Sequence, residues 1–251
     1  MSWVGFAIYS FGCWVTGLIA LRAALRLGSM AEWSVGMITI GVGGLGFPLL
    51  YLPVALPLSD SLRALTIGSA VVGLAIASMS LYFTTWRLFR PGSVVAALLC
   101  SAGSFAIAWS FLAIVFTQGY AWPRDPFWLA LQSAALWIPY PWTSLELFLA
   151  SRALRRSGDA AERARGKSYL CYGIATIALA LAFTPGIAVA IEHRGVTFSP
   201  ELVLFLIATS SVTMTSAAIG FADPLRRALR LRAEAAGAAK AGGATRASAS
   251  G

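Results

Sequence analysis

Long apolar segments alternate with short polar ones along most of the chain. Seven of these segments run for about 20 residues with little or no charge, the length that an α-helix needs to cross the hydrocarbon core of a bilayer. The pattern predicts an all-α, polytopic membrane protein with a seven-helix transmembrane bundle. The predicted spans cover about residues 3–21, 34–52, 65–83, 93–116, 127–150, 168–191 and 200–221.

The basic residues predict how this bundle is oriented. Sixteen of the 19 Lys and Arg residues follow the first, third, fifth and seventh spans, whereas Arg63, Arg124 and Arg194 follow the others. Cytoplasmic segments are enriched in Lys and Arg, so we expect the N-terminus outside and the C-terminus inside a plasma membrane, here a bacterial inner membrane. The net charge of +9 then reflects attraction to membrane lipids and does not indicate nucleic-acid binding.

The two ends of the chain carry different signals. Arg22 and Arg26 follow the first span and no basic residue precedes it, the reverse of a signal peptide, so we expect this span to be retained. Residues 223–232 form a short basic juxtamembrane segment. Residues 233–251 are rich in Ala, Gly and Ser without an apolar face, which predicts a disordered tail.

Composition supports the membrane class. Hydrophobic residues make up 58% of the chain and charged residues 12%, about half the charged fraction of soluble domains. The three cysteines, Cys13, Cys100 and Cys171, contain no closely spaced pair. We therefore predict buried apolar cysteines and no disulfide framework.

Few residues are suited to catalysis or cofactor binding. The single histidine, His193, cannot provide paired haem ligands or a metal cluster. Both lysines, Lys167 and Lys240, lie outside the predicted spans, so no lysine of the seventh span can bind retinal. We expect no metal, no cofactor and no enzymatic activity.

Two spans carry signals of close helix packing. In the second, the glycine-rich residues 41–46 precede Pro48, which removes a backbone hydrogen bond. This pattern fits either a tightly packed, kinked helix or a ligand site. In the third, Ser69, Gly73 and Ala77 lie four residues apart and give one helix face the small side chains that allow close approach in lipid.

The fifth span contains a Pro-Tyr-Pro-Trp sequence at residues 139–142, which predicts a helix break. Its aromatic side chains either pack around a kink or line a pocket between the second, fifth, sixth and seventh spans. The expected pocket or switch residues are Gln132, Tyr140, Trp142, Glu146, Ser211 and Thr215. Helix kinks are expected at Pro48, Pro139, Pro141 and Pro185.

Glu146 is the only carboxylate predicted to lie well inside a span, about two turns before a basic loop at residues 151–167. An ionisable side chain in this position marks a functional site by default, here a switch or a proton site. The alternative is a structural ion pair at the inner face with Arg22, Arg87 or Arg90. The partner must come from another helix, because no basic residue stands three or four positions later.

Spans one to three share a residue pattern with spans five to seven. Trp14 is followed by Arg22, as Trp142 is by Arg152, and the second and sixth spans both carry Gly near Pro. Such a shared pattern suggests a parallel 3+1+3 repeat. This layout resembles the opsin, G-protein-coupled-receptor and PQ-loop (SWEET) transporter group, which implies a divergent bacterial seven-span protein.

Individual motifs of that group are absent. The third span ends in Trp86-Arg87 instead of acid-Arg-Tyr, the seventh lacks Asn-Pro-x-x-Tyr, and no Pro-Gln pair occurs. The resemblance therefore covers architecture over residues 1–222 and assigns no site residue.

The concentration of basic residues on the predicted inner face favours a receptor-like or adaptor protein. It would bind a small ligand or membrane partner within the bundle and engage a cytoplasmic protein. The basic face would comprise Arg87, Arg90, Arg152, Arg155, Arg156, Arg163, Arg165, Lys167, Arg226 and Arg227. A small-solute carrier of 3+1+3 type and an accessory subunit of a membrane complex remain as alternatives.

Overall fold

The computed structural model of the chain describes residues 3–118, 126–191, 212–213, 215–216 and 219–220. These residues form helices joined by short connections, with no strand among them, as the sequence predicts. The elements are α1 (Trp3–Leu27), α2 (Met30–Ile38), η1 (Thr39–Gly46), α3 (Phe47–Ala55), α4 (Asp60–Thr84), η2 (Thr85–Phe89), α5 (Val94–Gln118), α6 (Pro126–Trp137), α7 (Pro139–Arg155) and α8 (Ala160–Ile191). The segments η1 and η2 are π-helical.

Four helical stretches of the described chain are long and apolar enough to cross a membrane. They are Tyr9–Leu27, Met30–Leu50, Asp60–Phe89 and Val94–Phe116. They coincide with the first four predicted spans. The fifth and sixth predicted spans fall on α6–α7 and α8, while most of the seventh and the whole predicted tail lie outside the described residues.

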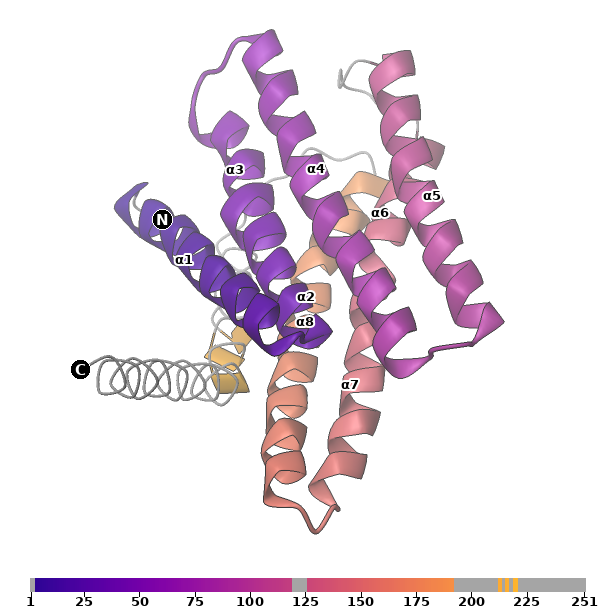
Figure 1. Ribbon diagram of the computed structural model, residues 1–251. Coiled ribbons are helices and arrows are strands. Elements are labelled where there is room, and N and C mark those ends of the chain that lie inside the picture. The colour runs from indigo at the N-terminus through magenta and orange to yellow at the C-terminus, as the bar shows by residue number, and fades with distance from the viewer. Residues whose placement is uncertain (1–2, 119–125, 192–211, 214, 217–218, 221–251) are drawn as a thin grey trace, which may run out of the picture.

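The helices from α1 to α5 run up and down between two ends of the molecule (Figure 1). The turns after α1, η2 and α7 lie toward the lower end in this view, and the α3–α4 connection lies at the upper end. Gly28 and Gly92 adopt φ values of 61° and 82° in the first two of these turns, a left-handed conformation that glycine adopts without strain. Every described Lys or Arg except Arg63 belongs to a segment near the lower turns.

The glycine-rich η1 lies between α1 and α4 and packs closely against both. A Cβ atom on Gly41 would lie 2.5 Å from the Gly73 carbonyl oxygen and 3.0 Å from the Ala77 Cβ. On the opposite side, a Cβ on Gly43 would overlap Cys13. The small-residue face predicted for the third span is therefore confirmed at Gly73 and Ala77, and η1 is a tightly packed helix.

Pro48 lies at the junction of η1 and α3, and α1 compensates for the backbone hydrogen bond that this proline cannot donate. Proline has no N–H, so the Gly44 carbonyl four residues earlier receives no α-helical hydrogen bond from it. That carbonyl instead accepts hydrogen bonds from Trp14 Nε1 at 3.2 Å and from the Ser10 hydroxyl at 3.4 Å. The first helix thus satisfies a backbone group that the proline leaves open.

We expect Gly41→Ala to lower the free energy of unfolding by about 1–3 kcal/mol, because the added methyl group collides with the backbone of α4. Thermal unfolding in mild detergent should then shift down by several degrees. Gly12→Ala on α1 is the matched control, since no described atom beyond its own helix backbone lies within 4 Å of its added Cβ. An equal shift in both variants would contradict close packing of η1 on α4.

Candidate functional site

One face of α4 and η2 presents polar side chains to α6 and α7. We call this the α4–α7 polar seam: Ser78, Tyr82, Thr85 and Arg90 on one side, and the Ala135 and Leu136 carbonyls, Thr143 and Glu146 on the other. The first three lie at intervals of four and three residues, so they share one face of the helix. All three are buried.

The upper part of the seam compensates a proline break. Because Pro139 lacks an N–H, the Ala135 carbonyl receives no α-helical hydrogen bond from it. The Tyr82 hydroxyl donates to that carbonyl at 3.1 Å, and the Ser78 hydroxyl donates to the neighbouring Leu136 carbonyl at 3.0 Å. The helix is interrupted at Ile138, and α4 supplies the donors that the break requires in an apolar environment.

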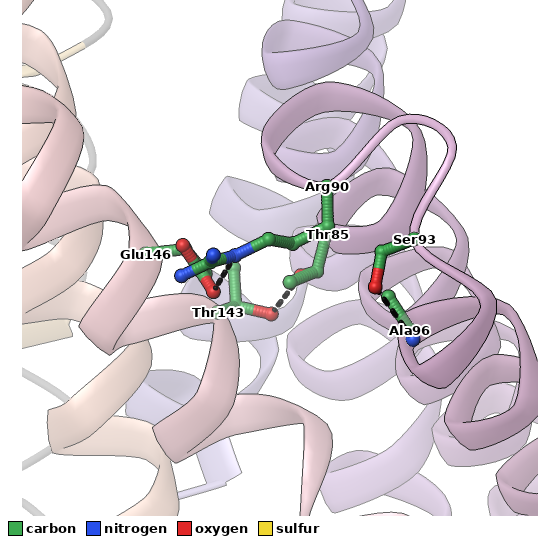
Figure 2. A network of polar contacts seen from close by, with 6 residues as sticks. All are labelled: Thr85, Arg90, Ser93, Ala96, Thr143 and Glu146. Carbon is green, nitrogen blue, oxygen red and sulfur yellow. Dashed lines mark hydrogen bonds and ion pairs between the residues drawn. The ribbon is translucent and has the colours of Figure 1, made fainter.

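The lower part of the seam joins η2 to α7 through two side-chain contacts, drawn in Figure 2. The Thr143 hydroxyl donates to the Pro139 carbonyl at 2.6 Å, so the Thr85 hydroxyl, 2.6 Å away, is the donor between the two threonines. Arg90 Nε donates to Glu146 Oε1 at 2.8 Å. The carboxylate is 8% exposed and the arginine 51%.

Of the three arginines predicted as ion-pair partners of Glu146, the structure places Arg90 in contact with it. The hydrogen bond and the charge of the carboxylate raise the pKa of Arg90 above its usual value, so the guanidinium stays cationic. Half-exposed ion pairs contribute modestly to stability, but this one fixes where η2 ends relative to α7. The contact gives Glu146 the partner on another helix that the sequence requires, and it fits both a structural ion pair and a switch.

The α6–α7 segment and α8 are antiparallel and are joined by a repeated contact. Trp137 Nε1 donates to the Ala180 carbonyl at 2.9 Å. Seven residues later on one segment and seven earlier on the other, the Ser144 hydroxyl donates to the Gly173 carbonyl at 2.7 Å. One more step of seven brings the Ser151 hydroxyl to the Gly166 carbonyl at 2.6 Å. The register therefore passes unchanged through the break at Ile138.

The segment predicted as a basic loop at residues 151–167 is largely helical, which corrects that prediction. Helix α7 continues to Arg155 and α8 begins at Ala160, so only a short turn separates them. Asp159 caps α8 by accepting from the Ala161 N–H at 2.9 Å, and Arg163 donates to the Gly158 carbonyl at 2.7 Å. The basic side chains thus project from a helical hairpin, seen at the bottom of Figure 1.

A cavity of about 50 Å³ lies beside the seam. Its walls come from six helical segments, α2, η1, α4, η2, α7 and α8, and from Thr213, and the surface that they present is mainly apolar. Leu88 and Phe89 of η2 and Leu147 of α7 line it, so the cavity reaches the residues next to the Arg90–Glu146 pair. A cavity of this size holds roughly two to four water molecules.

The hydroxyl groups of the cavity wall fall into two classes. The Thr176 hydroxyl donates to the Tyr172 carbonyl at 3.0 Å and Thr213 to the Ala175 carbonyl at 3.4 Å. By contrast, Ser34 Oγ and Thr84 Oγ1 make no hydrogen bond within the described part of the chain, although the two residues are only 5% and 2% exposed. A buried hydroxyl without a partner is unfavourable by about 1–3 kcal/mol, so these two groups require an explanation.

None of the predicted pocket residues that the structure describes lines this cavity. Tyr140 is fully buried in a core cluster that includes Ile38 and Leu179. The Trp142 ring lies 6.2 Å from that of Tyr82, between centroids. Both aromatic residues therefore pack around the helix break.

The other predicted pocket residues are dispersed. Gln132 is buried on α6, Glu146 belongs to the polar seam, and Thr215 is exposed. Ser211 lies outside the described residues. The cavity does lie between segments of the second, fifth, sixth and seventh predicted spans, together with the third.

The predicted kinks and basic residues occupy the following positions. Pro48 is the second residue of α3, Pro139 and Pro141 begin α7, and α8 continues past Pro185 to Ile191. The described basic-face residues are all exposed: Arg87, Arg90, Arg152, Arg155, Arg156, Arg163, Arg165 and Lys167. Arg226 and Arg227 lie outside the described residues.

Sequence reasoning missed three buried polar residues near the cavity. Glu32 precedes the second predicted span, yet it is only 5% exposed, so Glu146 is not the only buried carboxylate. Ser34 and Thr84 stand at the edges of their spans, where a hydroxyl side chain gives no sign of a site because polar residues are expected at the ends of a span. The spacing of Ser78, Tyr82 and Thr85 is visible in the sequence and identifies the seam face.

Comparison of the chain with protein-family models, with curated proteins and with solved structures gave no match. Within the described residues, no group of three or more His, Cys, Asp or Glu side chains is placed to hold a metal ion. The site must therefore be interpreted from its own chemistry.

A double-mutant cycle tests the seam. Tyr82→Phe leaves the Ala135 carbonyl without its interhelical donor, and we expect it to lower the free energy of unfolding by about 1–2 kcal/mol. In a Pro139→Ala background the restored N–H can bond that carbonyl, so the same change should have a smaller effect. Equal effects of Tyr82→Phe in both backgrounds would contradict the compensating role of Tyr82.

Proposed function

We propose that the chain is a receptor-like or adaptor protein of seven transmembrane spans, with its N-terminus outside and its C-terminus inside the cell. Its bundle binds a small ligand, and its basic inner face engages a cytoplasmic protein. The observation that carries the proposal is the cavity lined by the sequence neighbours of Arg90 and Glu146, because it brings a space for a molecule of a few non-hydrogen atoms close to the basic end of the bundle.

Only a few residues along the chain separate the cavity wall from the proposed inner face. Leu88 and Phe89, which line the cavity, directly precede Arg90, and Leu147 directly follows Glu146. A ligand that displaces either wall would alter the ion pair and with it the position of η2 against α7. Helix α7 leads on to the basic hairpin, so the same displacement would reach the surface offered to a partner.

The π-helical segments support movement at this place. Both η1 and η2 contribute residues to the cavity wall, Thr39 in the first and Leu88 and Phe89 in the second. Short π-helical segments within α-helices frequently occur at functional sites. This arrangement favours a ligand-responsive bundle over a rigid accessory subunit.

The orientation can be tested by labelling single cysteines in a variant whose three native cysteines are replaced by alanine. Ser61→Cys lies at the outer start of α4 and Gly158→Cys in the hairpin turn, and both positions are exposed. In intact cells, a membrane-impermeant maleimide should label Ser61→Cys, whereas Gly158→Cys should react only after permeabilisation. The reverse pattern would contradict the positive-inside orientation.

The partner-binding role can be tested by photocrosslinking in cells. A benzophenone amino acid in place of Gly158 should give a discrete adduct with a cytoplasmic protein, and the same amino acid in place of Ser61 should not. Glu146→Gln, which removes the charge of the ion pair and keeps its shape, should change the adduct yield without loss of folded protein.

Two outcomes would contradict this role. Adducts with lipid alone would show that the hairpin faces only the membrane surface. Uptake of sugars, amino acids or vitamins by proteoliposomes, without a crosslinked protein, would favour the small-solute carrier.

A further inference from the structure

The cavity contains two polar groups whose hydrogen-bonding capacity the described protein does not use. Ser34 projects from α2 and Thr84 from the last turn of α4, and both line the same space. Serine and threonine hydroxyls inside helices commonly donate to the carbonyl of the preceding turn. Thr39 and Ser80 do so here, at 2.7 Å each, whereas Ser34 and Thr84 do not.

The remaining wall restricts what those hydroxyls can bind. Among the described lining residues there is no Asp, Glu, Lys, Arg or His. The carboxylates of Glu32 and Glu146 are buried nearby, but neither residue belongs to the wall. Transfer of an ion into such a site without an opposite charge is strongly unfavourable, so the wall disfavours both cations and anions.

The aliphatic part of the wall adds a second restriction. The surface around the space is mainly apolar, and its aliphatic residues, among them Val35, Ile38, Leu81 and Leu179, offer no hydrogen bond to a molecule that is polar all round. A molecule with one polar group and a short apolar body would satisfy both regions. The volume of about 50 Å³ limits it to a few non-hydrogen atoms.

On the basis of the proposed function, we propose that this cavity binds a small uncharged molecule with one hydroxyl, carbonyl or amide group, held by Ser34 Oγ and Thr84 Oγ1. Each hydroxyl can both donate and accept, so the pair accommodates any of these groups. The short aliphatic part of the ligand packs against Leu81 and Leu179. The ligand thereby supplies the hydrogen bonds that the two buried hydroxyls lack.

Three fluorinated probes of similar size and different charge test this ligand class. They are fluoroethanol, which is neutral, fluoroacetate, which is an anion, and fluoroethylammonium, which is a cation. Fluorine NMR would follow each during titration into the full chain in nanodiscs of zwitterionic lipid, with empty nanodiscs as the reference. We expect saturable binding of fluoroethanol, at about millimolar concentration for so small a molecule, and none of the ions.

Substitutions assign the binding to this cavity. Thr84→Val keeps the side-chain shape and removes the hydroxyl, and we expect it to weaken fluoroethanol binding roughly two- to tenfold. Ser34→Ala should act in the same direction. Ala175→Leu places a larger side chain in the wall and should abolish binding. Ser80→Ala is the control on α4, because the Ser80 hydroxyl is buried but bonds its own helix.

Several results would overturn the proposal. Tighter binding of either ion would assign the cavity to charged ligands, and no saturable binding beyond empty nanodiscs would assign it to ordered water. Unchanged binding in Thr84→Val would place the site elsewhere, and this variant remains informative even if Ala175→Leu fails to fold. A protein adduct at position 158 is expected whatever fills the cavity, so these results would leave the proposed partner binding intact.

Discussion

The structure depends on donors from neighbouring helices for the backbone carbonyls that Pro48 and Pro139 free. In an apolar environment an unpaired carbonyl is unfavourable by several kcal/mol, and water is not present to relieve it. Pro48 frees the Gly44 carbonyl, to which Trp14 of α1 donates, and Pro139 frees the Ala135 carbonyl, to which Tyr82 of α4 donates. Each proline thus ties its own helix to a neighbour.

Side-chain donors also join helices where no proline frees the acceptor carbonyl. Between α6–α7 and α8, donors from Trp137, Ser144 and Ser151 reach carbonyls on the facing helix at every seventh residue. Two of the acceptors belong to glycines, because the absence of a side chain lets the hydroxyl reach the backbone. Side-chain donors on neighbouring backbone carbonyls therefore align three pairs of helical segments in this bundle.

Much of the helical framework follows from properties that are local in the sequence. Span length comes from runs of apolar residues, and the close approach of α4 to η1 follows from Gly73 and Ala77 at intervals of four. The break at residues 139–142 follows from two prolines, which forbid the helical hydrogen bonds wherever the segment is placed. The charge on Glu146 required a partner on another helix, but the choice of Arg90 depended on where η2 ends.

The cavity could not be predicted in this way, since it results from side chains that do not meet. Its wall draws at most four residues from any one helix, over segments as distant as Ala31 and Thr213, and no short stretch contains enough of them to give a signal. Whether a serine in a span bonds its own helix or faces a cavity depends on its side-chain rotation, which composition does not determine. Ser34 and Thr84 were therefore indistinguishable in the sequence from Thr39 and Ser80.

Buried hydroxyl groups that bond another helix and buried hydroxyl groups that bond nothing described have different explanations. Where a hydroxyl completes a hydrogen bond to a neighbouring helix, it is explained by the stability of the fold, and Tyr82 and Ser144 are of this kind. Ser34 and Thr84 add no such bond among the described residues and are still buried, so folding alone gives no reason for a hydroxyl at either position. The two hydroxyls share one cavity with Phe89 and Leu147, which are the sequence neighbours of Arg90 and Glu146, and the proposed function depends on this arrangement.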